Sequence, residues 1–218
     1  YGVVAFAAPL FVMRYTQKQY IERTLSSVAE LKRVNEELLE ASQEIGTINE
    51  ELFETLAQMI DSRDPFVYGH SQRVAEYAVA VAEELGFPEE RVEVVRRAAL
   101  VHDIGKIGIS ESVLYKPERL TPQESKYAQS HAILGAEFLE GCHSLREISI
   151  FVRHHHEWFD GQGYPDGLMG EEIHLEARII ALCDEVEAMA SDRPYHRGMA
   201  IAEIVAELRR GAGSQFDP

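Results

Sequence analysis

A histidine and an aspartate lie side by side at His102-Asp103, inside the apolar run Val101–Ile104. Burying an ionised group costs several kcal/mol unless a partner or a metal ion compensates it. The chain offers further imidazoles and carboxylates for this purpose: His70, His131, His154, His155, His156, Glu157 and Asp184. Nitrogen and oxygen donors of these kinds suit iron, manganese, zinc or nickel. The inventory predicts a site for more than one metal ion, and such a site indicates hydrolysis.

Two pairs of neighbouring residues, His102-Asp103 and His155-His156, can each serve two ions. Adjacent side chains on a helix point about 100° apart, so the members of a pair diverge. Asp103 can also bridge two ions with its two oxygens while His102 holds one of them. The pairs therefore favour a binuclear arrangement.

The remaining candidates are ambiguous when each is taken alone. Asp184 lies in an apolar helix, residues 177–189, where its carboxylate requires a metal ion or a salt bridge. His131 by itself fits an ordinary helix histidine, and His70 an ordinary residue at a helix start. Order and spacing, rather than any one residue, make the group specific.

From about residue 60 to residue 218, the segments that must position these residues carry the start and stop signals of helices. Gly86 ends one helix and Pro88, followed by two glutamates, starts the next. Thr121 to Glu124 form a capping box that opens a helix, which Gly141 closes. No stretch alternates as a strand does, so we predict an all-α domain. Residues 211–218 read as a loop, and we expect the chain to stop before its last helix.

A heptad pattern occupies residues 19–59. Apolar residues recur at two positions of the repeat: Leu31, Leu38, Ile45, Leu52 and Met59 at one, Val34, Ala41 and Ile48 at the other. This seam predicts a parallel dimeric coiled coil, a stalk that would join two copies of the chain. Thr55 and Gly46 weaken it. The alternative is a single amphipathic helix lying on the core.

The segment 1–18 is uncharged up to Met13 and then carries Arg14 and Lys18. It is shorter than the roughly 20 apolar residues that span a bilayer. We interpret it as the end of a truncated transmembrane helix with its basic residues inside. This predicts a location at the cytoplasmic face of the inner membrane. The alternative is an apolar helix packed on the domain.

The formal net charge of −16 excludes general binding of DNA or RNA polymers, whose phosphates an acidic surface repels. A small phosphorylated ligand remains compatible if metal ions supply positive charge locally. Cys142 and Cys183 show no metal or redox spacing and fit a reducing compartment.

The motifs from about residue 59 to 218 together resemble the HD-GYP domain, a branch of the HD phosphohydrolase superfamily. In order, the matching segments are Gly69–Ala75, His102–Lys106, His131–Gly135, His155–Pro165, Ala177–Ile179 before Asp184, and Asp192–Tyr195. The resemblance implies an HD-type helical bundle, here preceded by a long coiled-coil helix.

The resemblance also implies a metal-dependent phosphodiesterase that opens cyclic di-GMP to pGpG, in some members continuing to GMP. Two divalent ions, iron or manganese, would be held by His70, His102, Asp103, His131, His155, His156 and Asp184. Asp103 would bridge the ions, and Lys106 would contact the scissile phosphate. The substrate would lie beside Gly161, Gly163, Tyr164, Pro165 and Arg193.

Two carboxylates, Glu157 and Asp160, could orient the histidines by accepting their free N–H groups, or could be exposed carboxylates in a turn. Phe66 stands where some members have a third-metal glutamate, so we predict two ions. His196 stands where a recognition lysine is common, which leaves base preference open. The alternatives are a non-catalytic cyclic-dinucleotide-binding module and a phosphohydrolase for cyclic GMP-AMP or a linear nucleotide.

Overall fold

The structure, a computed structural model, describes residues 2–63, 68–192 and 197–218, with side chains from Leu10 onward. The chain divides into two compact units, Tyr1–Glu51 and Leu52–Pro218. Within the described residues no β-strand forms, and isolated bridges pair Asp160 with Met169 and Ala212 with Phe216. The prediction of an all-α protein is confirmed.

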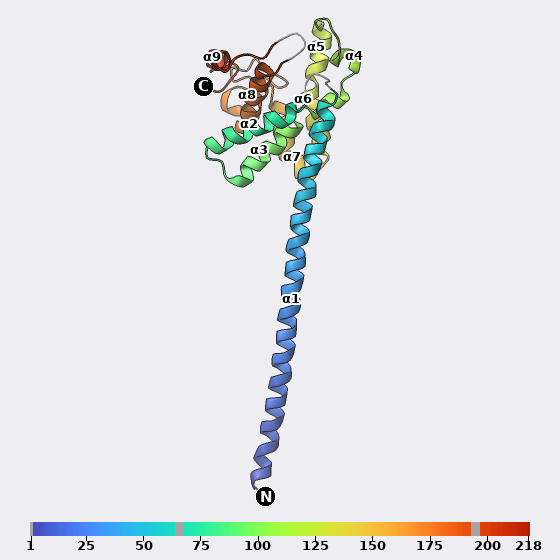
Figure 1. Ribbon diagram of the computed structural model, residues 1–218, viewed down its shortest axis with the longest axis vertical. Coiled ribbons are helices and arrows are strands. Elements are labelled where there is room, and N and C mark those ends of the chain that lie inside the picture. Colours follow the sequence, from blue (N-terminus) through green and yellow to red (C-terminus); the bar gives the residue numbers. More distant parts are fainter. Residues whose placement is uncertain (1, 64–67, 193–196) are drawn as a thin grey trace. The chain divides into compact units, whose positions relative to one another are not determined.

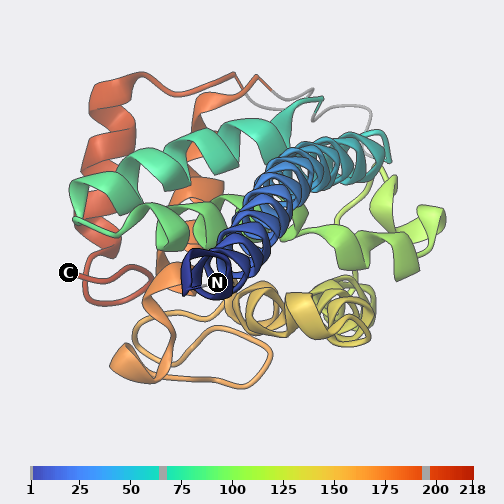
Figure 2. The same cartoon turned by 90° about the horizontal axis from the view of Figure 1, so that it is seen from below.

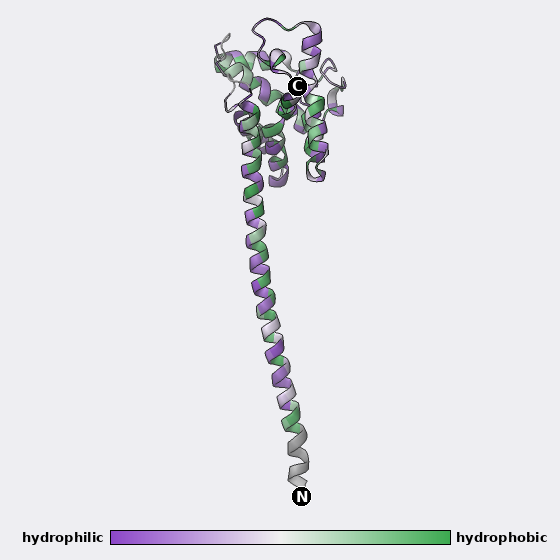
Figure 3. Cartoon of the chain, turned by 90° about the vertical axis from the view of Figure 1, so that its right-hand side faces the viewer, coloured by the Kyte–Doolittle hydropathy of each residue, from purple (hydrophilic) through white to green (hydrophobic). Residues whose placement is uncertain are grey.

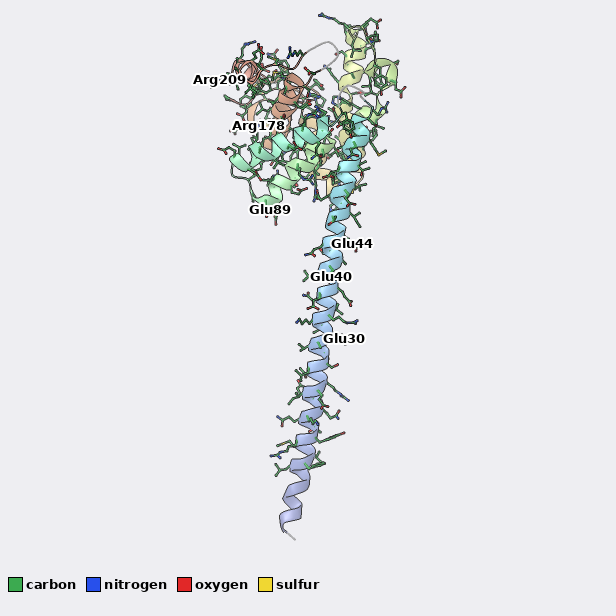
Figure 4. The ribbon with its side chains drawn as sticks, viewed as in Figure 1. Glu30, Glu40, Glu44, Glu89, Arg178 and Arg209 are labelled. Carbon is green, nitrogen blue, oxygen red and sulfur yellow. The ribbon has the colours of Figure 1, made fainter. Side chains whose placement is uncertain are left out.

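The first unit is one continuous helix, the larger part of α1 (Gly2–Asp61). Gly46 does not interrupt it. The apolar seam residues Leu31, Leu38 and Ile45 are exposed, and hydrophobic patches recur among hydrophilic residues along the helix (Figure 3). Glu30, Glu40 and Glu44 project from its surface (Figure 4). No described helix is long and apolar enough to cross a membrane.

The second unit is a bundle of short helices (Figure 1). In chain order they are α2 (His70–Glu84), α3 (Glu89–Val101), the 3-10 helix η1 (Ile104–Gly108), α4 (Glu111–Leu114), α5 (Pro122–Gln129), α6 (His131–Glu140), η2 (His143–Leu145), α7 (Arg146–His154), η3 (Gly170–Glu172), α8 (Leu175–Ala190) and α9 (Ile201–Gly211). Helices α2 and α3 run side by side (Figures 1 and 2).

The core of this unit lies where α2, α3, α7 and α8 meet. Val74, Leu100, Val152 and Ile180, one from each helix, are fully buried there. Small residues on α2 and α3, such as Ala78 and Ala98, allow the two helix backbones to approach. Burial of this apolar surface contributes roughly 25 cal/mol per Å² and fixes the mutual placement of the four helices.

The last turns of α1 also belong to this core, because Phe53, Ala57 and Ile60 are buried in it. The neighbouring seam residues Leu52 and Met59 stay exposed, so the face that packs is not the heptad seam. The structural division at Leu52 therefore falls earlier than the boundary at residue 60 that the heptad pattern predicted.

The capping box predicted at Thr121 is present. The Thr121 hydroxyl accepts from the Glu124 N–H at 3.3 Å, and the Glu124 carboxylate accepts from the Thr121 N–H at 2.8 Å. The single helix predicted from this box to Gly141 is wrong, because α5 ends at Gln129 and α6 begins at His131. The Ser130 hydroxyl donates to the Tyr127 carbonyl at 2.6 Å and its N–H bonds to the same oxygen, which tightens the chain into a turn.

Candidate metal centre

The candidate ligands sit mainly at helix ends. His70 is the first residue of α2 and His131 the first of α6, while His102-Asp103 follow α3 and His155-His156 follow α7. Asp184 alone lies inside a helix, α8. Since the apolar faces of these helices pack together, their ends meet beside the core. Six of the seven ligand candidates have buried or nearly buried side chains, and the seventh, Asp184, has a side chain only 18% exposed.

Three donors form what we call the first ligand group: His70, His102 and Asp184. The His70 Nε2 lies 3.2 Å from the Asp184 Oδ1 and 3.4 Å from the His102 Nε2. The His102 Nε2 lies 3.9 Å from the same carboxylate oxygen. Three donor atoms that converge this closely can surround one cation.

Three imidazoles form the second ligand group: His131, His155 and His156. The Nε2 atoms of His131 and His155 lie 3.4 Å apart. The His156 ring lies 5.0 Å from the His131 ring and 4.0 Å from the His155 ring, measured between centroids. This group offers nitrogen donors to a second cation.

Asp103 lies between the two groups and presents one oxygen to each. Its Oδ1 is 3.4 Å from the His131 Nε2, and its Oδ2 is 3.4 Å from the His102 Nε2 and 3.9 Å from the His70 Nε2. His102, Asp103 and His155 also form a converging set of their own. A carboxylate in this position can bridge two adjacent ions.

A repeated backbone contact orients three of the histidines. The Nδ1 atoms of His102, His131 and His155 lie 2.7, 2.8 and 2.6 Å from the carbonyl oxygens of Ala99, Ala128 and Val152. In each case the carbonyl belongs to the residue three positions earlier, so the end of a helix turn accepts the Nδ1 proton. This leaves the Nε2 atom as the free donor toward the centre.

His70 is oriented differently, by a carboxylate that the sequence analysis missed. Its Nδ1 lies 2.5 Å from the Glu187 Oε2, and Glu187 is fully buried. Arg73 and Ser191 donate to the other Glu187 oxygen. Glu187 follows Asp184 by three residues, one helical turn on the same face of α8, and that spacing is the signal that could have found it.

The second ligand group is held in its neutral form. Burial lowers the pKa of His155 well below 6.5, and the repulsion that a protonated His156 would exert lowers it further. Burial likewise lowers the pKa of His156 to about 4 and also lowers that of His131. Neutral imidazoles are the form that binds metal ions, so this group is ready to bind at neutral pH.

The surroundings of the first ligand group favour a protonated His70. Burial by itself would lower the pKa of His70, but hydrogen bonds to Asp184 and Glu187 outweigh it and raise the pKa to about 10. Burial would raise the pKa of Asp184, yet the hydrogen bond from His70 and the charge of His102 hold it well below 3.8. A cation entering this group must therefore displace the His70 proton.

Lys106 lies one turn after Asp103 and its ammonium is 2.5 Å from the Asp103 Oδ2. Burial would raise the pKa of Asp103, but the charges of Lys106 and His102 hold it well below 3.8. The Lys106 side chain remains one third exposed. Lys106 can therefore reach a bound anion beside the centre.

Two glycines allow the backbone to approach the site. A Cβ on Gly105 would lie 1.8 Å from the His131 carbonyl oxygen, so only glycine lets η1 pack against α6 and bring Asp103 toward His131. A Cβ on Gly163 would lie 2.2 Å from the Trp158 nitrogen. The loop that contains Gly163 thus folds directly against the His155-His156 segment.

The predicted substrate loop lies against His156 of the second ligand group. The Tyr164 ring lies 4.8 Å from the His156 ring, and the Tyr164 N–H donates to the His156 carbonyl at 3.1 Å. Gly161 has a φ of +81°, as its place in the turn requires, and Pro165 follows a cis peptide bond. The predicted contact Arg193, like Phe66 and His196, lies outside the described residues.

The role predicted for Glu157 and Asp160, orienting the histidines, is not what the structure shows. Buried Glu157 accepts from the backbone N–H groups of Asp166, Gly167 and Leu168, at 2.6 to 3.1 Å. Asp160 accepts from the backbone and side chain of Gln162 in a turn. Both shape the loop, because a carboxylate satisfies several backbone donors that a tight turn leaves open.

The donor set fits divalent cations of the kind that imidazole and carboxylate bind, since the seven converging groups are two carboxylates and five imidazoles. In chemical terms, the arrangement can hold cations side by side next to an accessible lysine.

Known proteins resemble this chain over the same region. The family model described as HD domain matches residues 54–218. The cyclic di-GMP phosphodiesterase response regulator RpfG of Xanthomonas campestris is 41% identical over 75% of this chain and 44% of its own length. The 3'3'-cGAMP-specific phosphodiesterase 3 of Vibrio cholerae is 36% identical over 74% of this chain and 35% of its own length. The chain thus spans less than half the length of these relatives.

Solved structures share the fold. A cyclic GMP-AMP-specific phosphodiesterase from V. cholerae superposes with a TM-score of 0.60 at 20% identity, over 77% of this chain and 45% of that one. The HD domain of the L. monocytogenes phosphodiesterase PgpH, in complex with cyclic-di-AMP, gives 0.55 at 25% identity, over 72% and 80%. HD phosphohydrolases are metal-dependent, which agrees with the clustered ligands. This chain belongs to the HD domain family, in the HD-GYP branch that its motifs resemble.

Proposed function

We propose that this chain is a metal-dependent phosphodiesterase that hydrolyses cyclic di-GMP to pGpG. The single observation that carries the proposal is the pair of ligand groups, with one Asp103 oxygen directed to each. Cyclic di-GMP phosphodiesterases among the relatives support the choice of substrate.

The two ligand groups would hold two ions, iron or manganese, and Asp103, with one oxygen toward each group, would be the residue they share. When bound, such ions supply Lewis acidity, which lowers the pKa of water and offsets the negative charge of a phosphodiester. The carbonyl contacts at Nδ1 and the Glu187 contact keep the Nε2 atoms directed toward one another, where they would bind the ions. The protein thus contributes a preorganised geometry, which costs no rearrangement during the reaction.

Lys106 contacts the scissile phosphate. Its ammonium already lies beside the Asp103 carboxylate and is partly exposed, so it can turn to an anion at the centre. The loop of Gly161, Gly163, Tyr164 and Pro165, together with Arg193, borders the nucleotide. Tyr164 offers an aromatic face over His156 for this purpose.

A turnover assay tests the proposal. The full chain, purified anaerobically and loaded with Mn²⁺ or Fe²⁺, should convert cyclic di-GMP to pGpG, and elemental analysis should give two ions per chain. Asp103→Asn should abolish turnover, because the bridging charge is lost. Full activity in Asp103→Asn would refute the ligand assignment, and tight binding without turnover under any divalent metal would favour the non-catalytic binding module.

A cyclic GMP-AMP is the second candidate substrate. The relatives named 3'3'-cGAMP-specific phosphodiesterases, at 34% to 36% identity, favour it, as does His196 in the position of a recognition lysine. Assays of cyclic di-GMP, 3'3'-cGAMP and linear pGpG under one metal condition separate these readings by their relative kcat/KM.

The stalk of residues 19–59 pairs two copies of the chain as a parallel coiled coil. Its seam is exposed, and glutamates occupy one flanking position in four successive heptads: Glu30, Glu37, Glu44 and Glu51. In a parallel pair these face the uncharged Asn35, Ser42 and Asn49 of the partner's other flank, whereas an antiparallel pair would set glutamate against glutamate. Analytical ultracentrifugation should give a dimer.

Residues 1–18 attach the chain to the cytoplasmic face of the cell membrane. The uncharged residues up to Met13, followed by Arg14 and Lys18, support this by their charge pattern. Fractionation of cells that express the full chain tests it. Recovery in the soluble fraction after low-salt lysis would refute the attachment.

A further inference from the structure

The C-terminal end of α1 is bonded to the first turn of α2, where the candidate ligand His70 lies. The Asp61 carboxylate accepts from the Ser71 hydroxyl at 2.6 Å and from the Ser71 N–H at 3.2 Å, and both residues are buried. Gly69, which precedes the helix, has no side chain to cap it. Asp61 therefore satisfies a backbone donor that the helix start leaves open, and its charge lies at the positive end of the helix dipole.

Arg63, two residues after the end of α1, is bonded to the segment that follows His102-Asp103. The Arg63 guanidinium donates to the carbonyl oxygens of Ile107 at 2.8 Å and of Ile109 at 3.2 Å. These carbonyls lie at the end of η1 and just beyond it. The Asp103 carbonyl accepts from the Lys106 N–H, and the Lys106 carbonyl from the Ile109 N–H, so a short chain of backbone bonds connects the Arg63 contact to Asp103.

We infer that Asp61 and Arg63 are positioning residues for the metal centre: they fix the start of α2 and the end of η1 to one helix end, and so set the separation of His70 from Asp103. The inference rests on the proposed function only through its metal centre. The anchor is rigid because Ala57 and Ile60, on the last turns of α1, are buried in the core.

Asp61 acts on one ligand group and Arg63 on both. Asp61 bonds to Ser71, the residue next to His70 of the first ligand group, and its hydrogen bonds within the described part of the chain do not reach the second group. Arg63 acts through the segment of Asp103, whose oxygens face both groups. A contact made directly to a ligand side chain is worth roughly 10- to 100-fold in metal affinity, so we expect the indirect contacts of Asp61 and Arg63 to be worth the lower end, roughly 10-fold.

The test is a Mn²⁺ titration of the full chain, followed by electron paramagnetic resonance and elemental analysis. Asp61→Asn should lower the affinity for one of the two ions by roughly 10-fold and leave the affinity for the other unchanged. Arg63→Met should lower the affinity for both ions. Ser71→Ala removes only the 2.6 Å hydroxyl bond, so it should lower the affinity for the same ion as Asp61→Asn, by a smaller factor. This variant tests the inference even if Asp61→Asn does not fold.

Glu176→Gln is the matched control. Glu176 is also a buried carboxylate, but it accepts from Arg91 two helical turns before Asp184. Glu176→Gln should lower the unfolding temperature of the protein and leave the affinities for both ions unchanged. Wild-type affinity for both ions in folded Asp61→Asn and Ser71→Ala, or equal weakening in Glu176→Gln, would overturn the inference. A wild-type chain that binds two Mn²⁺ ions without hydrolysing cyclic dinucleotides would refute the proposed function alone.

Discussion

Replacing Glu187 by glutamine is the most discriminating perturbation of the centre. Glu187 contacts no candidate cation position itself, yet its Oε2 lies 2.5 Å from the His70 Nδ1. Three donors, from His70, Arg73 and Ser191, hold the pKa of this carboxyl at about 2 although burial opposes them. Glu187→Gln keeps the volume and one acceptor oxygen but removes the charge.

The expected loss follows from these contacts. Outer contacts to a metal-binding histidine are worth roughly 10- to 100-fold in metal affinity, which is about 1.4 to 2.7 kcal/mol. The neutral amide also turns a donor toward one of the three partners. The Arg73 side chain, 38% exposed, can find water instead, so we place the loss of folding free energy at about 1 to 3 kcal/mol.

Calorimetric titration with Mn²⁺ measures the affinity loss ion by ion. We expect the ion of the first ligand group to bind roughly 10- to 100-fold more weakly and the ion of the second group to bind as in the wild type. Thermal unfolding of the metal-free protein reports the stability loss separately. Equal weakening of both ions, or unchanged affinity for both, would refute the reasoning that Glu187 acts through His70.

Four further outcomes are expected. Because the pKa of His70 is raised to about 10 while that of His156 is lowered to about 4, Mn²⁺ affinity of the first group should rise between pH 6.5 and 10, with proton release in calorimetry. The fold stabilises protonated His70, so its contribution to metal-free stability is complete below pH 6.5 and is lost toward pH 10; a flat profile contradicts this. Gly105→Ala should cost about 1 to 3 kcal/mol or more in denaturant unfolding, since its Cβ meets the His131 carbonyl. Ile45→Asp should convert the dimer to a monomer in sedimentation without changing turnover per chain, and a persistent dimer would contradict the seam.

The sequence was sufficient for the helices and for the residue types of the site. The all-α prediction rested on Gly86, Pro88 and the Thr121 capping box, which are local signals read by nearby backbone groups. The prediction of a single helix from Thr121 to Gly141 was wrong at Ser130, where the serine side chain bonds back to a carbonyl three residues earlier and two helices form. Such a bond competes with the helix ladder in a way that residue type alone does not reveal.

The outer contacts of the site were the part that sequence reasoning left open or missed. Glu157 and Asp160 are next to the histidines along the chain, but they serve backbone donors of their own loop. Glu187, more than a hundred residues from His70, is the carboxylate that orients it. Proximity in sequence was a poor guide because helix packing, not chain order, brings α8 against α2.

The sequence by itself determines the list of donors. Local signals, namely caps, glycines and apolar faces, determine the helix ends that carry His70, His102-Asp103, His131 and His155-His156. What only the tertiary structure decides is the division of labour among them. The packing of α2, α3, α7 and α8 divides six donors into two groups of three and directs one Asp103 oxygen to each group. It also places a backbone carbonyl or Glu187 behind each imidazole that is oriented through its Nδ1. The physical reason is that donor convergence is set by distances of a few ångströms between distant segments, and burial of apolar surface fixes those distances.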